Sequence, residues 1–532
     1  MRQTREVTRT GGPLAVELFA PGMTALHRVG LAGLAMTLQA LESDASAGEL
    51  RALGAWTVSD RSVTLDWTGD GKRFFAALIA ASFRLTDRGL IWFPALGDPL
   101  DNPGHAVVLH NATLGTFLQH PRTRKSAART PVSLTVEVDG ESQVVTFLPL
   151  AGYAHQKVVF DPLRPQEVAG WLYPGGVVRH VQAGGQTALV EDPPRALPLL
   201  YAPVGAIYFQ VHRQTAGVRP RYCLVLPAVA DLLAYAVVRQ LFLRQGTARL
   251  QVAGAAEAAA RVLAELEAYG LLRQVDADRC EVVAFGTVPW SKQQKTRVER
   301  FTVTGARPEA LRTYRVAAQA LPPRLAEGKP DPKTGGIPHW WVVPQTPDLV
   351  AENVIVGAPW WRGFRDFWER LRMGMKPEQR KWALQGERRG LQQMVSYGGT
   401  MPDGPEVRLV RACQEAWRRR LGALGERARR QGLSFGDLAG REYERVRISF
   451  ARCKSAALLR QTLTDFWSRA GGPLPDLQED WPDVLPFLNE RWRDARDLAL
   501  LALASYKPQT PEEREALGEG TPEPAPVSGE GE

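Results

Sequence analysis

The sequence predicts an α+β protein in which a large mixed α/β region precedes an all-α helical bundle. Before residue 355, short apolar runs bounded by turn residues recur, which is typical of strands mixed with helices. From Trp360 to Ser505, apolar residues recur every three to four positions with only short breaks, which is typical of antiparallel helices. We therefore expect a mixed domain over 1–355, a bundle over 356–506 and a disordered acidic tail over 507–532.

Composition limits the function classes. The 532-residue chain carries a formal net charge of +9, which favours an anionic partner without proving one. None of its four cysteines forms a Cys-x-x-Cys pair, so neither a zinc ribbon nor a redox motif is predicted, and a reducing, cytoplasmic compartment fits. The chain has no apolar signal-peptide segment and no run of about 18 apolar residues, so we expect no membrane association.

The first strong helix signal follows a short strand. We expect a strand over Leu14–Ala20 and a helix from the N-cap Thr24 to about Leu41. This helix is apolar on nearly every face, so it is buried within its own domain or against another subunit. Gly30 and Gly33 lie on one side, where they would let a second backbone approach closely. Tight internal packing is the favoured interpretation.

The rest of the mixed region alternates strands and helices. The clearest hairpin covers Val132–Pro149, with alternating apolar residues and an Asp139-Gly140 turn. Residues 320–350 are rich in Pro and Gly, which predicts an ordered, irregular connection. The other expected elements are strands at Val63–Trp67, Leu90–Phe93, Gly205–Val211 and Tyr222–Leu226, and helices at Arg73–Ser82, 104–119, 229–243 and 254–269.

One basic stretch, FGTVPWSKQQKTRVER at Phe285–Arg300, combines three kinds of side chain that suit nucleic acid. A strand from Val282 is expected to end at Gly286, with a break at Pro289 and a partner strand over Thr296–Thr304. Gln can read a base edge, Lys and Arg can neutralise phosphate, and Trp offers a stacking face. A solvated basic turn is equally compatible with the composition. The candidate DNA-binding residues here are Lys292, Gln293, Gln294, Lys295 and Arg297.

Two smaller groups have similar chemistry. Gln156 and Lys157 combine an amide with a cation, which makes them second candidates for DNA contact. Arg122, Arg124 and Lys125 follow a proline and form a candidate phosphate-binding loop. A solvated loop explains the second group equally well.

The predicted bundle holds nearly all of the excess positive charge. Between Trp360 and Ser505 there are 27 Lys and Arg against 19 Asp and Glu, a net charge of +8. Its helices are expected over about 405–430, 440–468 and 483–505. Charged helix faces are usually only solvated, but the uneven sign favours a surface for nucleic acid. The candidate residues are Arg418, Arg419, Arg420, Arg427, Arg430, Arg445 and Arg452.

Catalytic chemistry is hard to place in this sequence. It contains neither a Gly-x-x-x-x-Gly-Lys-Ser/Thr loop nor a Gly-x-Ser-x-Gly elbow, and its eight histidines form no His-x-x-x-His pair. We therefore predict no catalytic residue, no metal and no cofactor. Carboxylates far apart in the sequence could still converge, so a metal-dependent nuclease with dispersed ligands stays as an alternative.

Four stretches together resemble the large subunit of type I CRISPR–Cas effector complexes (Cascade), the eighth Cas family, and its myxobacterial-type branch near subtypes I-A and I-B. They are LFAPGMTALHRVGLAGLAMTL (18–38), LGTFLQHPRTRK (114–125), FGTVPWSKQQKTRVE (285–299) and LVAENVIVGAPWWRGF (349–364). The resemblance covers most of residues 14–505. Some type I-B large subunits carry a zinc-binding cysteine cluster, which this sequence lacks, so that feature is not carried over.

The resemblance implies a non-catalytic, DNA-reading subunit of a ribonucleoprotein complex. Its partners would be the crRNA, target double-stranded DNA, backbone and handle-binding Cas subunits, small subunits and a separate helicase-nuclease. The residues around Gln293 would then read the PAM, the loop at Arg122 would hold the 5′ handle of the crRNA, and the bundle would hold the displaced strand. Internal initiation near Met373, Met375, Met394 or Met401 is a hypothesis for the source of the small subunits. A purely structural assembly protein is a further alternative.

Overall fold

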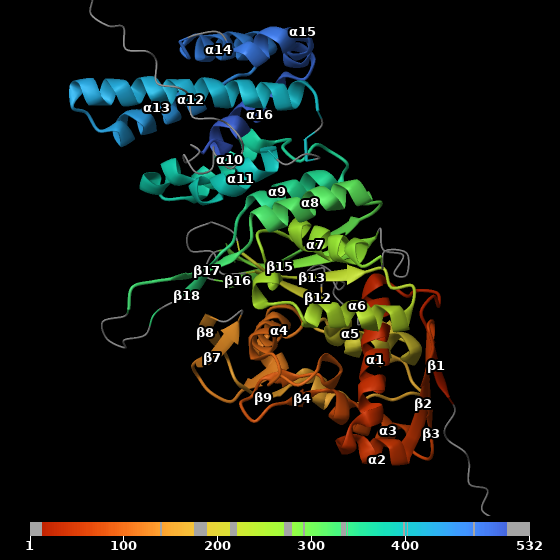
Figure 1. Ribbon diagram of the computed structural model, residues 1–532. Helices are drawn as coiled ribbons and strands as arrows, with labels where there is room; N and C mark the ends of the chain where they lie inside the picture. The colour runs from red at the N-terminus through yellow and green to blue at the C-terminus, as the bar shows by residue number, and fades with distance from the viewer. Residues whose placement is uncertain are drawn as a thin grey trace, which may run out of the picture. The chain divides into compact units, whose positions relative to one another are not determined.

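The computed structural model describes residues 13–138, 141–174, 189–212, 221–270, 279–290, 293–330, 337, 339–396, 400–401, 403–471 and 474–507 (Figure 1). The chain divides into two compact units, Met1–Trp360 and Trp361–Glu532. The first unit mixes helices and strands, and the described part of the second is helical. The predicted α+β class is therefore confirmed.

The first unit begins with a small antiparallel sheet and a buried helix. The sheet has the order β1-β3-β2, formed by Leu14–Glu17, Ser62–Trp67 and Gly54–Val58. Helix α1 (Ala25–Ser43) follows Thr24, whose hydroxyl lies 2.8 Å from Nδ1 of His27. Helices α2 (Gly48–Leu53) and α3 (Gly71–Ser82) complete this part of the chain.

Helix α1 packs against α5 (Pro193–Gly205), and its apolar faces are covered within the same unit. Gly30 and Gly33 both face the α5 backbone, where an added β-carbon would collide with carbonyl oxygens. The internal packing that the sequence favours is what the structure has. No second subunit is needed to bury this helix.

A five-stranded sheet forms the centre of the first unit. Its order is β14-β12-β13-β15-β16, and its strands are Gln251–Val252, Ile207–Val211, Arg221–Pro227, Cys280–Trp290 and Gln293–Val303. Helix α7 (Ala255–Ala268) packs on one face, backed by α8 (Pro308–Ala320) and α9 (Thr346–Ile355). Helices α1 and α4 (Pro103–Thr116) contact the sheet from the other side, with α6 (Leu232–Leu243) near α1 (Figure 1).

Several short ribbons surround this sheet. The predicted hairpin is confirmed as β7 (Val132–Val138) paired with β8 (Glu141–Phe147), and Asp139 and Gly140 lie outside the described residues. The expectation of an irregular connection over 320–350 is wrong in part. There β17 (Arg324–Glu327) pairs with β18 (His339–Val342), because the apolar run at Trp340 can pair with a segment before the Pro-rich stretch. The other short ribbons are β4 (Arg84–Leu85) with β5 (Ile91–Trp92), β6 (Arg124–Ser126) with β9 (Leu150–Tyr153), and β10 (Gln166–Glu167) with β11 (Val190–Glu191).

The second unit is organised around its last helix, α16 (Trp492–Ser505), which is buried from Ala495 onward. Six helices pack against it: α10 (Phe364–Gly374), α11 (Arg388–Ser396), α12 (Pro405–Gln431), α13 (Phe435–Ala451), α14 (Ala456–Ser468) and α15 (Pro475–Glu490). Such packing buries the apolar stripe of each helix.

Two helices that the sequence predicts as continuous are divided. The helix expected over 440–468 stops at Ala451 and restarts after Ser455, whose hydroxyl accepts a hydrogen bond from the Leu458 N–H at 3.2 Å. The helix expected over 483–505 is interrupted at Arg491. Apolar periodicity runs across both breaks, so the pattern alone does not reveal them.

Candidate nucleic-acid interface

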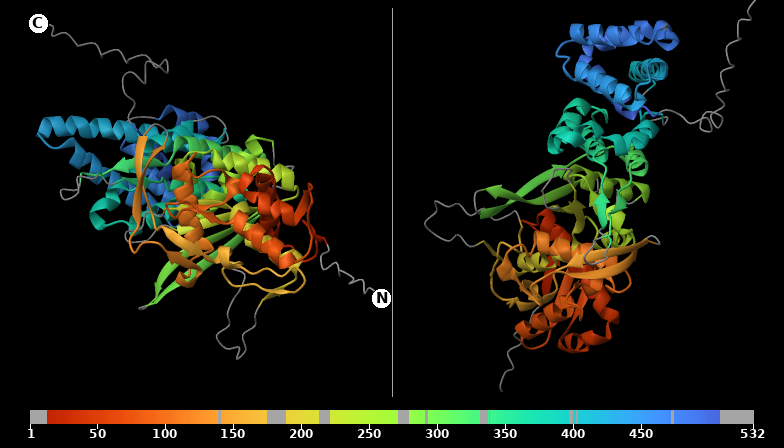
Figure 2. Two further views of the ribbon diagram at one scale, coloured as in Figure 1. Left: turned by 90° about the horizontal axis from the view of Figure 1, so that it is seen from below. Right: turned by 90° about the vertical axis from the view of Figure 1, so that its left-hand side faces the viewer.

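The β15–β16 hairpin is longer than the sheet that supports it. Within the described ranges, which omit 213–220, strand β13 pairs with Cys280–Phe285, whereas β16 pairs with β15 as far as Trp290, opposite Gln293. The outer half is therefore a two-stranded arm that extends past the sheet (Figure 2). The break expected at Pro289 is wrong, because β15 continues to Trp290. Proline is tolerated at such a position, where no described strand pairs with the other side of β15.

The predicted DNA-binding residues lie on this arm. Lys292 lies outside the described residues, and so do the side chains of Gln293, Gln294, Lys295 and Arg297. The backbone register pairs these four with Trp290, Pro289, Val288 and Gly286. Because successive strand residues alternate between faces, positions 293, 295 and 297 share one face and position 294 belongs to the other.

The base of the hairpin is fixed to the body of the unit. Arg300 forms an ion pair with Glu281 across the two strands. Its guanidinium also lies over the Tyr173 ring, 5.9 Å from the ring centre. Burial raises the pKa of Glu281, and the charge of Arg300 opposes that effect. The arm therefore rises from an anchored base.

Gln156 and Lys157 differ in what they can offer to a ligand. The Gln156 side chain donates to the Phe83 carbonyl at 3.1 Å and accepts from the Tyr153 N–H at 3.2 Å. Both ends of its amide are thus used inside the protein. Lys157 is exposed at the end of the same short helical turn, Ala154–Lys157. The structure favours Lys157 over Gln156 as a contact residue.

The three cations of the predicted handle loop have different roles in the structure. The Arg124 guanidinium donates to the carbonyls of Leu118 at 2.7 Å and Leu114 at 3.3 Å, which closes the C-terminal end of α4. Burial lowers the pKa of Arg124. Arg122 and Lys125 are exposed on either side of it. Two of the three cations therefore face solvent, and the third supports the helix.

Most of the predicted bundle arginines are paired with acids. Arg418 and Arg419 both bind Glu415 at 2.7 Å. The Arg418 hydrogen bond, with that of Arg419, lowers the pKa of Glu415 although burial opposes the shift. Arg430 pairs with Glu426 at 3.0 Å on the surface. Local pairing of this kind reduces the charge available to a phosphate backbone.

Glu442 holds a second pair of cations between α12 and α13. Arg420 donates to its carboxylate at 2.9 Å, and Arg445 also binds it. Burial raises the pKa of Glu442, but the hydrogen bonds from Arg445 and Arg420 outweigh it and lower the pKa below its usual value. Arg420 therefore links α12 to α13, whereas Arg445 pairs with Glu442 within α13.

Two of the predicted cations are freer. Arg427 is exposed and donates only to the Gln431 amide oxygen at 3.0 Å, and Arg452 is exposed at the end of α13. Among the described residues, no carboxylate pairs with either of them. Arg429, Arg441 and Lys454 are also exposed on these helices, and helical spacing from the chosen arginines could have added them to the prediction.

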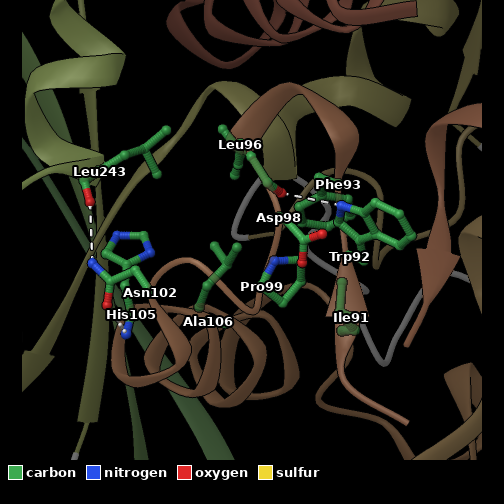
Figure 3. Close-up of a pocket in the computed structure, with 12 residues that line it drawn as sticks. Ile91, Trp92, Phe93, Leu96, Asp98, Pro99, Asn102, His105, Ala106 and Leu243 are labelled. Carbon is green, nitrogen blue, oxygen red and sulfur yellow. Dashed lines mark hydrogen bonds between the residues drawn. The ribbon is translucent and has the colours of Figure 1, made fainter. Parts of the chain in front are cut away.

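A pocket in the first unit lies away from these predicted contacts. Asn102, at the start of α4, donates to the Leu243 carbonyl at 3.4 Å on one side, and Trp92 donates to the Gly97 carbonyl at 3.1 Å on the other (Figure 3). None of the predicted nucleic-acid residues lines this pocket.

The described part of the chain contains no group of three His, Cys, Asp or Glu side chains placed to hold a metal ion. Within the same residues, no helix is both long and apolar enough to cross a membrane.

Comparison with known proteins gives a consistent result over most of the chain. Residues 15–200 match the model of the DevT N-terminal domain, and residues 402–527 match that of the DevT C-terminal domain. The chain is 33% identical over 528 residues to the CRISPR-associated protein Cas8a1/Csx13 of Myxococcus xanthus. That alignment covers 93% of this chain and 89% of the relative.

Proposed function

Because the chain belongs to the Cas8a1/Csx13 family of CRISPR-associated proteins, we propose that it is the non-catalytic large subunit of a CRISPR RNA-guided DNA surveillance complex of the Cascade type. In this role the protein recognises the PAM, contacts the 5′ handle of the crRNA and stabilises the R-loop. A separate helicase-nuclease, recruited by the assembled complex, cuts the DNA. The protein reads a short duplex motif, and base pairing reads the rest of the target.

The observation that carries the PAM assignment is the two-stranded arm formed by β15 and β16. It carries Gln293, Lys295 and Arg297 in alternating positions beyond the last residue that β13 supports. A two-stranded ribbon fits the major groove, where amide side chains can distinguish bases and cations can contact the flanking phosphates. Lys292 and Gln294 complete the proposed reading set. Lys157 is a second contact, with Gln156 acting mainly to hold its own turn.

The crRNA handle is assigned to the loop that follows α4. Arg122 and Lys125 are exposed there and would contact phosphate. Arg124 would position them by holding the end of the helix.

The displaced strand is assigned to the exposed cations of α12 and α13. Arg427 and Arg452 are the main candidates, and the acid-paired arginines around Glu415 and Glu442 have a supporting role. Contacts of this kind would be independent of sequence and strongly dependent on salt.

The small subunits are assigned to internal initiation within the same gene. The match to the DevT C-terminal domain begins at residue 402, directly after Met401. A product starting there would contain helices α12 to α16. Intact-mass spectrometry of the purified complex tests this, and finding no C-terminal fragment would remove the assignment.

A binding assay on the reconstituted complex tests the main proposal. Two duplexes share one protospacer and differ only in the PAM. We expect tight binding to the first, weak binding to the second, and no cleavage by the complex without its helicase-nuclease. Metal-dependent cleavage by the purified chain would favour a nuclease instead. DNA affinity that is unchanged when this subunit is left out would favour a purely structural assembly role.

A further inference from the structure

Arg239, on α6, is buried without a counter-charge. Its side chain is 1% exposed, and none of the described residues pairs a carboxylate with it. Tyr208 and Tyr235 interact with its charge, and their hydroxyls donate to the carbonyls of Pro203 at 2.8 Å and Gly205 at 2.6 Å. The Arg239 Nε has no hydrogen-bond partner among these residues. Within the described residues, the Arg239 guanidinium thus has no salt bridge, and its Nε has no hydrogen-bond acceptor.

Such a group is costly in a protein interior. A guanidinium stays charged at every physiological pH, so it cannot escape the penalty by losing a proton. An isolated buried charge destabilises a fold strongly unless an opposite charge or acceptors compensate it. An uncharged side chain of similar size, such as methionine, would fill an apolar site without this cost. The position of Arg239 thus indicates a missing acceptor.

A small pocket lies next to this guanidinium. Arg239, Tyr208 and Phe242 form part of its wall, and His105 and Leu109 of α4 form another part. His105 and Leu109 also line the larger pocket of Figure 3, which is more open to solvent. The two pockets are therefore neighbours that share two lining residues.

The chemistry of the small pocket suits an anion and not a cation. Burial, and then the charge of Arg239, lowers the pKa of His105 to about 3, so the imidazole is neutral. A neutral imidazole can donate a hydrogen bond without adding charge. None of the residues that line the small pocket is acidic. The space beside the guanidinium has room for about one water-sized group, which is too little for a phosphate.

We infer that this pocket binds one monatomic anion of about the size of chloride, held by the Arg239 guanidinium, as a structural ligand of the first unit. The anion supplies the counter-charge that none of the described residues provides. Its binding stabilises the folded state by mass action, because the unfolded chain has no such site. This role is separate from the proposed contacts with DNA and RNA.

Bromide replaces chloride at such sites and scatters X-rays anomalously. Crystals of the full chain grown in sodium bromide should show an anomalous peak within about 3.5 Å of the Arg239 guanidinium, at hydrogen-bonding distance. An ordered water at that position, with no bromide peak, overturns the inference. This measurement uses the unaltered protein, so it decides the question even if variants at position 239 fail to fold.

Thermal unfolding supplies an independent test. At constant ionic strength, exchanging gluconate for chloride should raise Tm by about 2 °C for each tenfold rise in chloride. Arg239→Met should abolish this dependence, whereas Arg88→Met, at an exposed arginine, should keep it. Equal Tm in chloride and gluconate for the unaltered chain overturns the inference. A bromide peak without any chloride-dependent Tm would show an adventitious ion only and would also overturn the structural role.

Discussion

A β-carbon on Gly30 would lie 2.0 Å from the carbonyl oxygen of Pro198, so α1 and α5 are in direct backbone contact. The relationship is reciprocal along the pair of helices, because a β-carbon on Gly205 would lie 2.0 Å from the carbonyl oxygen of Val29. No side chain can be inserted at these points without separating the helices. The packing of α1 against α5 therefore requires residues without a side chain at these glycine positions.

Gly30→Ala should destabilise the first unit by about 3 kcal/mol or more, because overpacking against backbone leaves no flexible group to move. Thermal or denaturant unfolding measures this. Gly48→Ala is the matched control: Gly48 opens α2 with helical dihedral angles and has nothing within 4 Å of its added β-carbon. That variant should be neutral or slightly more stable. Equal losses in both variants would contradict the close-contact argument.

The hairpin arm gives a prediction about faces. If the duplex meets the face that carries Lys295 and Arg297, Gln293→Ala should weaken PAM discrimination by about 1–3 kcal/mol, whereas Gln294→Ala should have little effect. Lys295→Ala should lower affinity for all PAM variants alike, because a phosphate contact carries no sequence information. Competition binding of matched and altered PAM duplexes to the complex measures both.

Gln393→Ala serves as an amide control, because Gln393 is exposed on α11 in the second unit. It should change neither affinity nor discrimination. Unchanged discrimination in both Gln293→Ala and Gln294→Ala would remove base reading from the arm.

The sequence predicted much of this fold because apolar periodicity is local. Helix α1, the β7–β8 hairpin and the helical nature of the second unit all follow from such patterns. The breaks at Ser455 and Arg491 were not predicted, because the three-to-four-residue spacing of apolar residues continues across both of them. The pairing of β17 with β18 depends on two segments separated by a Pro-rich stretch, which no local window contains.

The candidate site could be predicted in type but not in detail. Composition points to basic surfaces, but it does not tell which arginine meets an acid. Arg420 and Arg445 share Glu442 across two helices, and Arg124 caps a helix. Nor could a sequence show that Arg239 is buried with no acid among the described residues beside it, since burial and pairing are both tertiary properties.

A buried arginine in the second unit gives a stability prediction. The Arg447 side chain is 5% exposed and binds both Glu444 and Glu369, and Arg372 donates to Glu444 as well. Burial raises the pKa of Glu444, but the Arg447 and Arg372 hydrogen bonds outweigh it and hold the pKa at about 2. Arg447→Met should therefore lower the unfolding free energy by about 1–3 kcal/mol, because Glu369 loses this ion pair and Glu444 keeps only Arg372.

Arg430→Met is the matched control for that change. Arg430 pairs with Glu426 at 3.0 Å, but the two side chains are 79% and 63% exposed. Water screens such a pair, so the loss should be about 0–1 kcal/mol. Chemical denaturation of both variants would contradict the burial argument if their losses were equal.

Between pH 7 and 5, the two units should respond to acid in opposite ways. All eight histidines of the chain lie in the first unit. Burial lowers the pKa of His27 and His110 to about 4, and of His155 to about 3. Below pH 6.5 these histidines bind protons in the unfolded chain, whereas in the folded unit they stay neutral until the pH approaches their lowered pKa values. The stability of the first unit should therefore fall as the pH drops from about 6.5 toward 4.

In the second unit, Asp497 gives the opposite dependence of stability on pH. Burial raises its pKa to about 6, against the opposing charge of Arg496, so the folded state binds a proton more tightly than the unfolded state. The contribution of Asp497 should stabilise the second unit as the pH falls from about 6 to 4. As the pH is lowered from 7 to 5, calorimetry should show that the unfolding transition of the first unit moves to lower temperature. Loss of both units together at the same rate would contradict this assignment.

The bundle prediction concerns salt. Reversing Arg427 and Arg452 to Glu should weaken retention of single-stranded DNA and reduce the slope of log K against log salt by about 0.7 for each phosphate that the protein no longer neutralises. These positions are informative because no described acid pairs with them, so reversal changes the surface and leaves the fold intact. Reversing Arg420 would instead place two acids together at Glu442 and disturb the fold.

Arg370→Glu, at an exposed position on α10, should keep the original slope if binding is confined to α12 and α13. The affinity should be measured at several salt concentrations. A variant that loses a phosphate contact changes the slope of log K against log salt, whereas a variant that loses no phosphate contact keeps the slope even if its affinity changes. An unchanged slope in the Arg427 and Arg452 double variant would mean that this surface contacts protein. The positive charge of the bundle would then serve to hold acidic partner subunits, because the same exposed guanidinium groups bind carboxylates as well as phosphates.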